Sequence, residues 1–177
     1  MANSANNKKL KVSVVGCGGR GTGAAVQALR ADENVELVAM ADAFKDRLEK
    51  SLNAIKQEFE GEKKIEVKEK NMLVGFNGYK KAIDLADVVI LATPPGFRPL
   101  HFKYAIDQDK HVFMEKPVAT DAHGVRQVLE TAKVANQKKL NVVVGLQRRY
   151  QYSYLNILKQ VRSCLLYTSP SPRDQLT

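Results

Sequence analysis

The chain has 177 residues, of which 44% are hydrophobic and 27% are charged. This length suits one domain with a sizeable core, and no apolar run is long enough to cross a bilayer, so we expect no membrane association. The formal net charge of +9 raises nucleic-acid binding, but residues 58–70, the densest basic stretch, alternate lysines with glutamates in the manner of a solvated surface, so we expect no nucleic-acid partner.

The chain begins with a polar stretch, 1–9, that lacks the apolar core of a signal peptide. We interpret it as a disordered lead-in and expect a cytoplasmic protein. From residue 10 onward short apolar runs alternate with amphipathic segments, which predicts an α/β fold with a Rossmann-type doubly wound parallel sheet. The predicted strands are Leu10–Val15, Val35–Ala41, Met72–Val74, Val88–Ala92, His111–Met114 and Asn141–Leu146.

Amphipathic helices are predicted between these strands, because apolar residues recur there at helical spacing. Asp121, or alternatively Thr120, is expected to cap the helix before the last strand. Two stripes are predicted to face the core: Phe44, Leu48, Leu52, Ile55 and Phe59 in one helix, and Val125, Val128, Leu129, Ala132 and Ala135 in the other.

The first chemical signal lies between the first strand and the first helix, where Gly16, Gly18 and Gly21 form a G-x-G-x-x-G motif. In this context the first glycine permits a tight turn, the second admits a pyrophosphate close to the backbone, and the third permits helix-to-strand packing. The helix N-terminus offers free N–H groups to the phosphates. Gly19 and Arg20 complete the predicted cofactor-binding loop.

Asp42 ends the second strand, about 20 residues beyond the motif, where the dinucleotide fingerprint places an acidic residue. A carboxylate there accepts hydrogen bonds from ribose hydroxyls and repels a 2′-phosphate, which favours NAD over NADP as the cofactor. Lys45 and Arg47 are close enough in sequence to neutralise a phosphate, although surface cations of a helix are the simpler interpretation.

The fifth strand runs directly into Glu115, Lys116 and Pro117, a poor continuation for a buried strand. The carboxyl ends of strands in a doubly wound sheet are where ligands bind. Charged side chains on a rigid turn at this point therefore indicate a ligand site rather than a surface ion pair.

The C-terminal stretch 164–177 departs in composition and periodicity from the rest of the chain. Cys164 to Asp174 match the translation of a transposase sequencing adapter, so we interpret 164–177 as an artefact and exclude it from the fold. The alternative is a Ser/Pro-rich linker. With Cys17 the only other cysteine, neither a disulfide framework nor a metal site is predicted.

The segments "ILATPPGFRPLH", "KHVFMEKPVAT" and "VVVGLQRRYQ" follow the glycine motif in order. Together they resemble the N-terminal domain of the Gfo/Idh/MocA oxidoreductases, and the resemblance covers Leu10 to Ser163. It implies a dinucleotide-binding Rossmann domain over 10–150 and a following α/β substrate domain. Residues 151–163 would be the start of that second domain, which is otherwise missing.

The resemblance implies roles for individual residues. Lys116 would be catalytic, pointing at the reacting hydroxyl group, and Glu115 would lie near the nicotinamide ribose. Thr93, Pro94 and Gln147 would also contact the cofactor. His101 has a counterpart in the family, but a packing or capping histidine is an equal alternative.

The family resemblance implies a hydride transfer between NAD(P) and a secondary alcohol of a sugar, a polyol or a similar small molecule. The family's usual Asp and His lie in the second domain, which can also carry a homo-oligomer interface, so we expect this fragment to bind the dinucleotide but to be inactive alone. The alternatives are an NAD-dependent glycoside hydrolase of the same family, a non-catalytic NAD-binding module and a methyltransferase.

Overall fold

The computed structural model describes residues 9–163. The chain forms two compact units, and the boundary between them in the sequence lies after Val144. The predicted tail, and the predicted lead-in apart from Lys9, lie outside the described residues. The elements of the first unit are β1 (Leu10–Val15), α1 (Gly19–Ala31), β2 (Val35–Asp42), α2 (Lys45–Glu58), η1 (Glu69–Asn71), β3 (Met72–Val74), α3 (Gly78–Asp84), β4 (Val88–Leu91), α4 (Arg98–Asp107), β5 (His111–Met114), α5 (Ala122–Gln137) and β6 (Val142–Val144).

The strands form one parallel sheet in the order β3-β2-β1-β4-β5-β6. Chain order reverses between β1 and β4, so a crevice is expected at their carboxyl ends. The predicted Rossmann-type doubly wound sheet is thus confirmed, and each predicted strand is present at its expected place.

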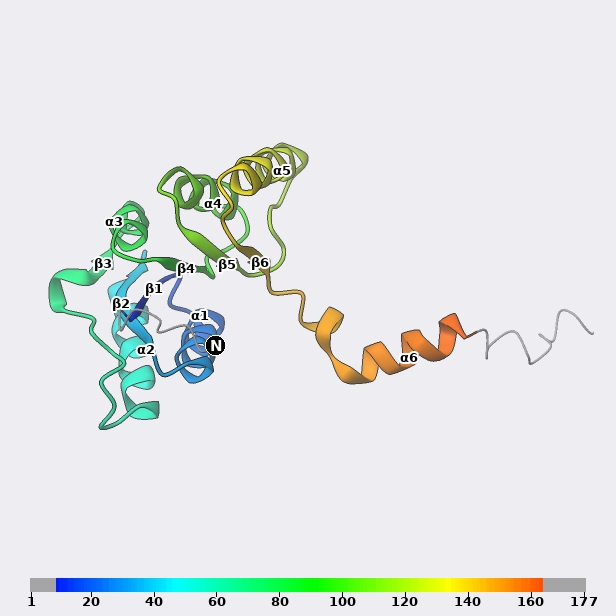
Figure 1. Ribbon diagram of the computed structural model, residues 1–177. Coiled ribbons are helices and arrows are strands. Elements are labelled where there is room, and N and C mark those ends of the chain that lie inside the picture. Colours follow the sequence, from blue (N-terminus) through cyan, green and yellow to red (C-terminus); the bar gives the residue numbers. More distant parts are fainter. Residues whose placement is uncertain (1–8, 164–177) are drawn as a thin grey trace, which may run out of the picture. The chain divides into compact units, whose positions relative to one another are not determined.

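Helices cover both faces of the sheet (Figure 1). On one face α1 and α2 bury a cluster that includes Val14, Leu29 and Leu48. On the other face α3, α4 and α5 bury a second cluster around Phe102 and Ile106. The central strands are apolar on both sides because each side faces a helical layer.

Three residues predicted to be buried are exposed: Phe44 by 57%, Val125 by 41% and Leu129 by 59%. Phe44 precedes α2 with extended backbone, so its side chain falls outside the helical stripe. The buried stripe of α5 is Gly124, Val128, Thr131 and Ala135. Small and polar residues at two of those positions shift the packed face away from Val125 and Leu129.

Two boundaries follow from local hydrogen bonding. The Asp121 carboxylate accepts a hydrogen bond from the Gly124 N–H at 2.7 Å, so Asp121 rather than Thr120 caps α5. At the sheet edge β6 is limited to Val142–Val144, shorter than predicted, because it pairs only with β5, whose last residue, Met114, pairs with Val144.

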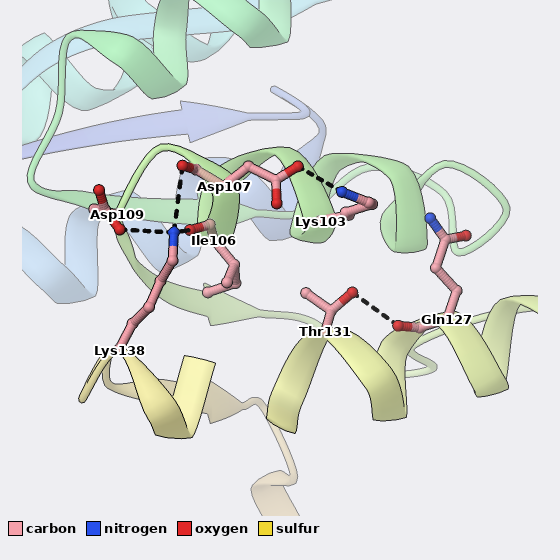
Figure 2. A network of polar contacts seen from close by, with 7 residues as sticks. All are labelled: Lys103, Ile106, Asp107, Asp109, Gln127, Thr131 and Lys138. Carbon is pink, nitrogen blue, oxygen red and sulfur yellow. Dashed lines mark hydrogen bonds and ion pairs between the residues drawn. The ribbon is translucent and has the colours of Figure 1, made fainter. Parts of the chain in front are cut away.

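Lys138, just after α5, ties that helix to the end of α4 (Figure 2). Its ammonium group donates to the carbonyl oxygens of Ile106 at 2.9 Å and Asp107 at 3.4 Å, and it lies 2.8 Å from the Asp109 carboxylate. A cation at the C-terminal end of α4 is also favoured by the partial negative charge of that helix end.

The second unit contains η2 (Gln147–Tyr150) and α6 (Tyr152–Arg162). Arg148 lies over the Tyr154 ring at 4.8 Å, and none of the α6 side chains is buried. Among the described residues, no helix combines the length and apolar character that a bilayer crossing requires.

Candidate dinucleotide-binding site

The loop between β1 and α1 fixes two of its motif glycines by close packing. Gly16 has a φ of +97°, and a Cβ atom there would lie 2.6 Å from the Thr93 nitrogen. A Cβ atom on Gly21 would lie only 1.9 Å from the Gly16 carbonyl oxygen. These positions therefore admit glycine alone and bring α1 against the end of β1 and the start of the Thr93 loop.

Gly18 and Gly19 are open instead, because a Cβ atom at either would meet nothing within 4 Å. Gly18 is the N-cap of α1, no side chain caps the helix, and its first turn carries no acidic residue. The free N–H groups and the partial positive charge of this helix end therefore face an open space that suits a phosphate.

Asp42, at the end of β2, lies beside the same loop. Its carboxylate accepts hydrogen bonds from the Cys17 N–H at 2.7 Å and from the Phe44 N–H at 3.0 Å. One acceptor site on each oxygen is thus used by the backbone, and the remaining lone pairs are available to ribose hydroxyls. The predicted juxtaposition of the acid with the glycine loop is present.

A pocket of about 430 Å³ opens between the loop and α2. Its lining residues are Cys17, Gly18, Gly19, Thr22, Arg47, Lys50, Ser51 and Ala54. The two cations considered from the sequence have different surroundings. The Lys45 ammonium nitrogen lies 3.5 Å from a Glu49 carboxylate oxygen, whereas Arg47 lines the pocket. The wall formed by α2 therefore carries positive charge opposite the N-terminus of α1.

At the carboxyl end of β5, Glu115 is buried with 6% of its surface exposed. Arg20 reaches it from the first turn of α1, with Nη2 2.8 Å from the Glu115 Oε1 atom. The two groups form an ion pair. The Glu115 carboxylate raises the pKa of Arg20. The structure thus joins two predicted site residues from separate strand ends.

Lys116 follows Glu115 and is exposed. The Lys116–Pro117 peptide bond is cis. Lys116 therefore stands on a turn at the ligand-binding edge of the sheet, where the family resemblance expects the catalytic lysine.

Thr93 and Pro94 follow β4, and this loop is held by residues that sequence reasoning did not select. The Arg98 guanidinium, 2% exposed, donates hydrogen bonds to the carbonyl oxygens of Thr93 and Pro117. The only sequence signal was an arginine before a proline at a helix start, a combination that is also common on protein surfaces. Only the packing of the loops after β4 and β5 shows that Arg98 is buried between them.

His101 lies behind Thr93, with its Nδ1 atom 3.2 Å from the Thr93 hydroxyl and its ring 4.2 Å from the Tyr79 ring. Burial, assisted by the positive charge of Arg98, lowers the pKa of His101 to about 4. A histidine that is neutral and packed at neutral pH fits the packing alternative.

This burial predicts acid sensitivity. Because the folded-state pKa of His101 is below the ordinary value of 6.5, the unfolded chain binds a proton that the folded chain lacks between these values. Stability should therefore fall as the pH falls through that window, by about 2 kcal/mol at pH 5. In urea unfolding at pH 7 and pH 5, His101→Gln should lose most of this pH-dependent difference. The exposed His123→Gln should retain it, and an equal difference in all three proteins would exclude His101 as its source.

Cys17 also lines the pocket but is buried, and burial together with the Asp42 carboxylate raises the pKa of its thiol to about 12. The thiol therefore stays protonated at neutral pH and is a poor nucleophile. Within residues 9–163 no three His, Cys, Asp or Glu side chains gather in a way that could hold a metal ion.

Gln147, the remaining predicted cofactor contact, lies in η2 of the second unit together with Arg148 and Arg149. The arrangement described above is built from the first unit alone. The role of Gln147 stays a prediction.

A parallel sheet of this strand order, an uncapped helix after a glycine loop and an acidic residue at the end of β2 define a dinucleotide-binding Rossmann domain. Residues 10–146 match the family described as "Oxidoreductase family, NAD-binding Rossmann fold". The chain belongs to this family, the Gfo/Idh/MocA oxidoreductases, as the sequence resemblance predicted.

Curated relatives are similar over most of the chain. An inositol 2-dehydrogenase from Cereibacter sphaeroides is 27% identical over 156 residues, which cover 88% of this chain and 42% of that protein. A glucose-6-phosphate 3-dehydrogenase from Bacillus subtilis is 28% identical, covering 85% and 37% respectively. The chain thus spans less than half the length of the curated relatives it matches.

A solved structure is likewise similar to most of this chain and is covered over less than half of its own length. The crystal structure of myo-inositol 2-dehydrogenase from Lactobacillus plantarum has a TM-score of 0.68 and 26% sequence identity, covering 88% of this chain and 42% of that one. These relatives are named as dehydrogenases and give no support to the glycoside hydrolase alternative.

Proposed function

We propose that this chain is the NAD-binding part of a dehydrogenase that acts on a secondary alcohol of a polyol or sugar. The observation that carries the proposal is the arrangement at the end of β1: Gly18 and the uncapped start of α1 are open to a pyrophosphate, with the Asp42 carboxylate alongside. Relatives named for inositol and for glucose 6-phosphate support the substrate class.

The adenosine half of NAD is proposed to lie beside β1 and β2. The free N–H groups of α1 would bind the pyrophosphate, with Gly18 and Gly19 leaving room for it. Asp42 would accept hydrogen bonds from the adenosine ribose. Arg20, which is half exposed, would add a positive charge at the start of the same helix.

The nicotinamide half is proposed to lie at the ends of β4 and β5, across the reversal in strand order. Thr93 and Pro94 would flank it on one side and Glu115 on the other, with Gln147 as a further contact. Bound NAD⁺ supplies the hydride acceptor. The substrate hydroxyl gives up a proton as its carbon is oxidised, and the residue that takes this proton is expected in the part of the relatives that this chain does not span.

NAD is proposed over NADP because the Asp42 carboxylate would repel the 2′-phosphate of NADP. The cations Arg47 and Lys50 in the pocket wall act in the opposite direction, because they would attract that phosphate. Asp42→Ala should weaken NAD⁺ binding about tenfold through loss of charged hydrogen bonds, and should leave NADP⁺ binding unchanged or improved. Dissociation constants for both cofactors, measured by calorimetry on wild type and variant, test this prediction.

The ratio of the two constants is the informative quantity, because Asp42 also holds Cys17 and Phe44, and any loosening of the loop affects both cofactors alike. Asp46→Ala, an exposed carboxylate in the first turn of α2, is the matched control and should leave the ratio unchanged. An unchanged ratio in Asp42→Ala would remove Asp42 from the ribose site.

Lys116 is proposed to donate a hydrogen bond to the reacting oxygen and to stabilise its alkoxide character. In this chain Lys116→Ala should change the NAD⁺ dissociation constant less than about threefold, because a change below about 0.7 kcal/mol is expected for an exposed side chain without a cofactor contact. In the complete protein the same change should lower kcat about 100-fold. A large loss of NAD⁺ affinity would instead make Lys116 a binding residue.

A further inference from the structure

Arg98 is a buried cation that bridges two loops of the site. It is the first residue of α4 and is followed by Pro99. Its Nη2 atom donates to the Thr93 carbonyl oxygen, after β4, and its Nη1 atom donates to the Pro117 carbonyl oxygen, after β5. One planar guanidinium therefore spans the carboxyl ends of two neighbouring strands.

The same guanidinium acts electrostatically on Glu115. Burial lowers the pKa of Arg98, and the Glu115 carboxylate offsets part of that effect. Arg20 lies at 2.8 Å from one Glu115 oxygen, so the buried carboxylate is influenced by one arginine from α1 and another from α4. Burying a cation costs free energy, and bonding to two carbonyl groups could have been done by neutral side chains. The negative charge of Glu115 offsets part of this cost.

From this geometry we infer that Arg98 is a positioning residue for the nicotinamide half of the cofactor. It joins the Thr93 loop to the turn after Glu115, and with 2% of its surface exposed it leaves little surface for a direct contact with the dinucleotide. The inference rests on the proposed function, because it assigns Arg98 to the NAD site. It goes beyond that function because it predicts that Arg98 affects binding of the nicotinamide half of NAD and not of the adenosine half.

The separation follows from where the partners of Arg98 lie. Thr93, Glu115 and Pro117 belong to the β4 and β5 ends, whereas Gly18 and Asp42 belong to the β1 and β2 ends. A loss of the bridge should therefore disturb nicotinamide binding and leave adenosine and pyrophosphate binding intact. A purely structural role would reduce both together.

The test compares NAD⁺ with ADP, which lacks the nicotinamide nucleoside, in titrations of the ¹⁵N-labelled full chain followed by NMR. Arg98→Lys keeps the charge but lacks the planar fork that reaches both carbonyl groups. We expect the NAD⁺ dissociation constant to rise about tenfold, equivalent to about 1.4 kcal/mol, and the ADP constant to change less than about twofold. Arg30→Lys, an exposed arginine of α1, is the matched control and should change neither.

Three results would overturn the inference: unchanged NAD⁺ binding in Arg98→Lys, equal weakening of NAD⁺ and ADP, or loss of cooperative folding. Normal ADP binding by the variant also serves as the check on its fold. If wild-type protein binds neither NAD⁺ nor ADP, the proposed function itself fails, and that result is distinct from any of the three.

Discussion

Gly21→Ala is expected to destabilise the protein by about 3 kcal/mol or more, a large effect for one added methyl group. The new Cβ atom would lie 1.9 Å from the Gly16 carbonyl oxygen, 3.1 Å from the Gly16 carbonyl carbon and 3.3 Å from the Ala92 Cβ atom. The first two contacts are with backbone, which cannot rotate away as a flexible side chain would. Helix α1 would have to move away from the end of β1.

Gly23→Ala is the matched control, two residues further along the same helix. A Cβ atom there meets nothing within 4 Å, so the change should stabilise the protein by about 0.5–1 kcal/mol through the higher helix propensity of alanine. Urea unfolding of both variants gives the comparison. A Gly21→Ala protein as stable as wild type would show that α1 does not pack against the Gly16 carbonyl group.

The sheet could be predicted because its signals are local. Each central strand is a short apolar run with helical patterns between the runs, and Gly16 and Asp42 lie at the ends of such runs. Parallel strands covered on both faces can be predicted from this pattern alone. The same holds for the N-cap Asp121, whose bond to Gly124 is made within one turn.

The exposed positions on α5 show where periodicity fails. Val125 and Leu129 belong to a helical stripe by spacing, but the helix rotates to pack Gly124 and Thr131 against its neighbours. A Cβ atom on Gly124 would lie 3.1 Å from the Pro99 side chain, so close approach of α4 and α5 decides which face is buried. That choice depends on the partner helix, which the stripe itself does not contain.

The candidate site was only partly predictable for a similar reason. Residues such as Gly18, Asp42 and Glu115 could be selected because each lies at the end of a predicted strand or within three residues after it. The contacts of Arg20 with Glu115 and of Arg98 with Pro117 join residues far apart in the chain. From sequence an arginine is expected at the surface, and neither the burial of Arg98 nor the partner of Arg20 could be predicted without the fold.

Gly18→Ala is expected to separate binding from stability. Its backbone is extended, with φ −72° and ψ 178°, which alanine adopts freely, and its Cβ atom would meet nothing within 4 Å in the folded protein. The free energy of unfolding should therefore stay within about 0.5 kcal/mol of wild type, as for a surface change. The methyl group would, however, occupy the space proposed for the pyrophosphate. NAD⁺ should bind about 100-fold more weakly, a loss of about 3 kcal/mol.

Calorimetric titration with NAD⁺, alongside urea unfolding of the same samples, measures both quantities. Gly23→Ala again provides the control, since it adds the same methyl group to α1 beyond the first turn and should bind NAD⁺ as wild type does. Weak binding by Gly18→Ala with unchanged stability places the pyrophosphate against this glycine. Wild-type affinity would mean that the dinucleotide crosses the sheet edge elsewhere, because the start of α1 could not accept both a methyl group and a phosphate at the same point.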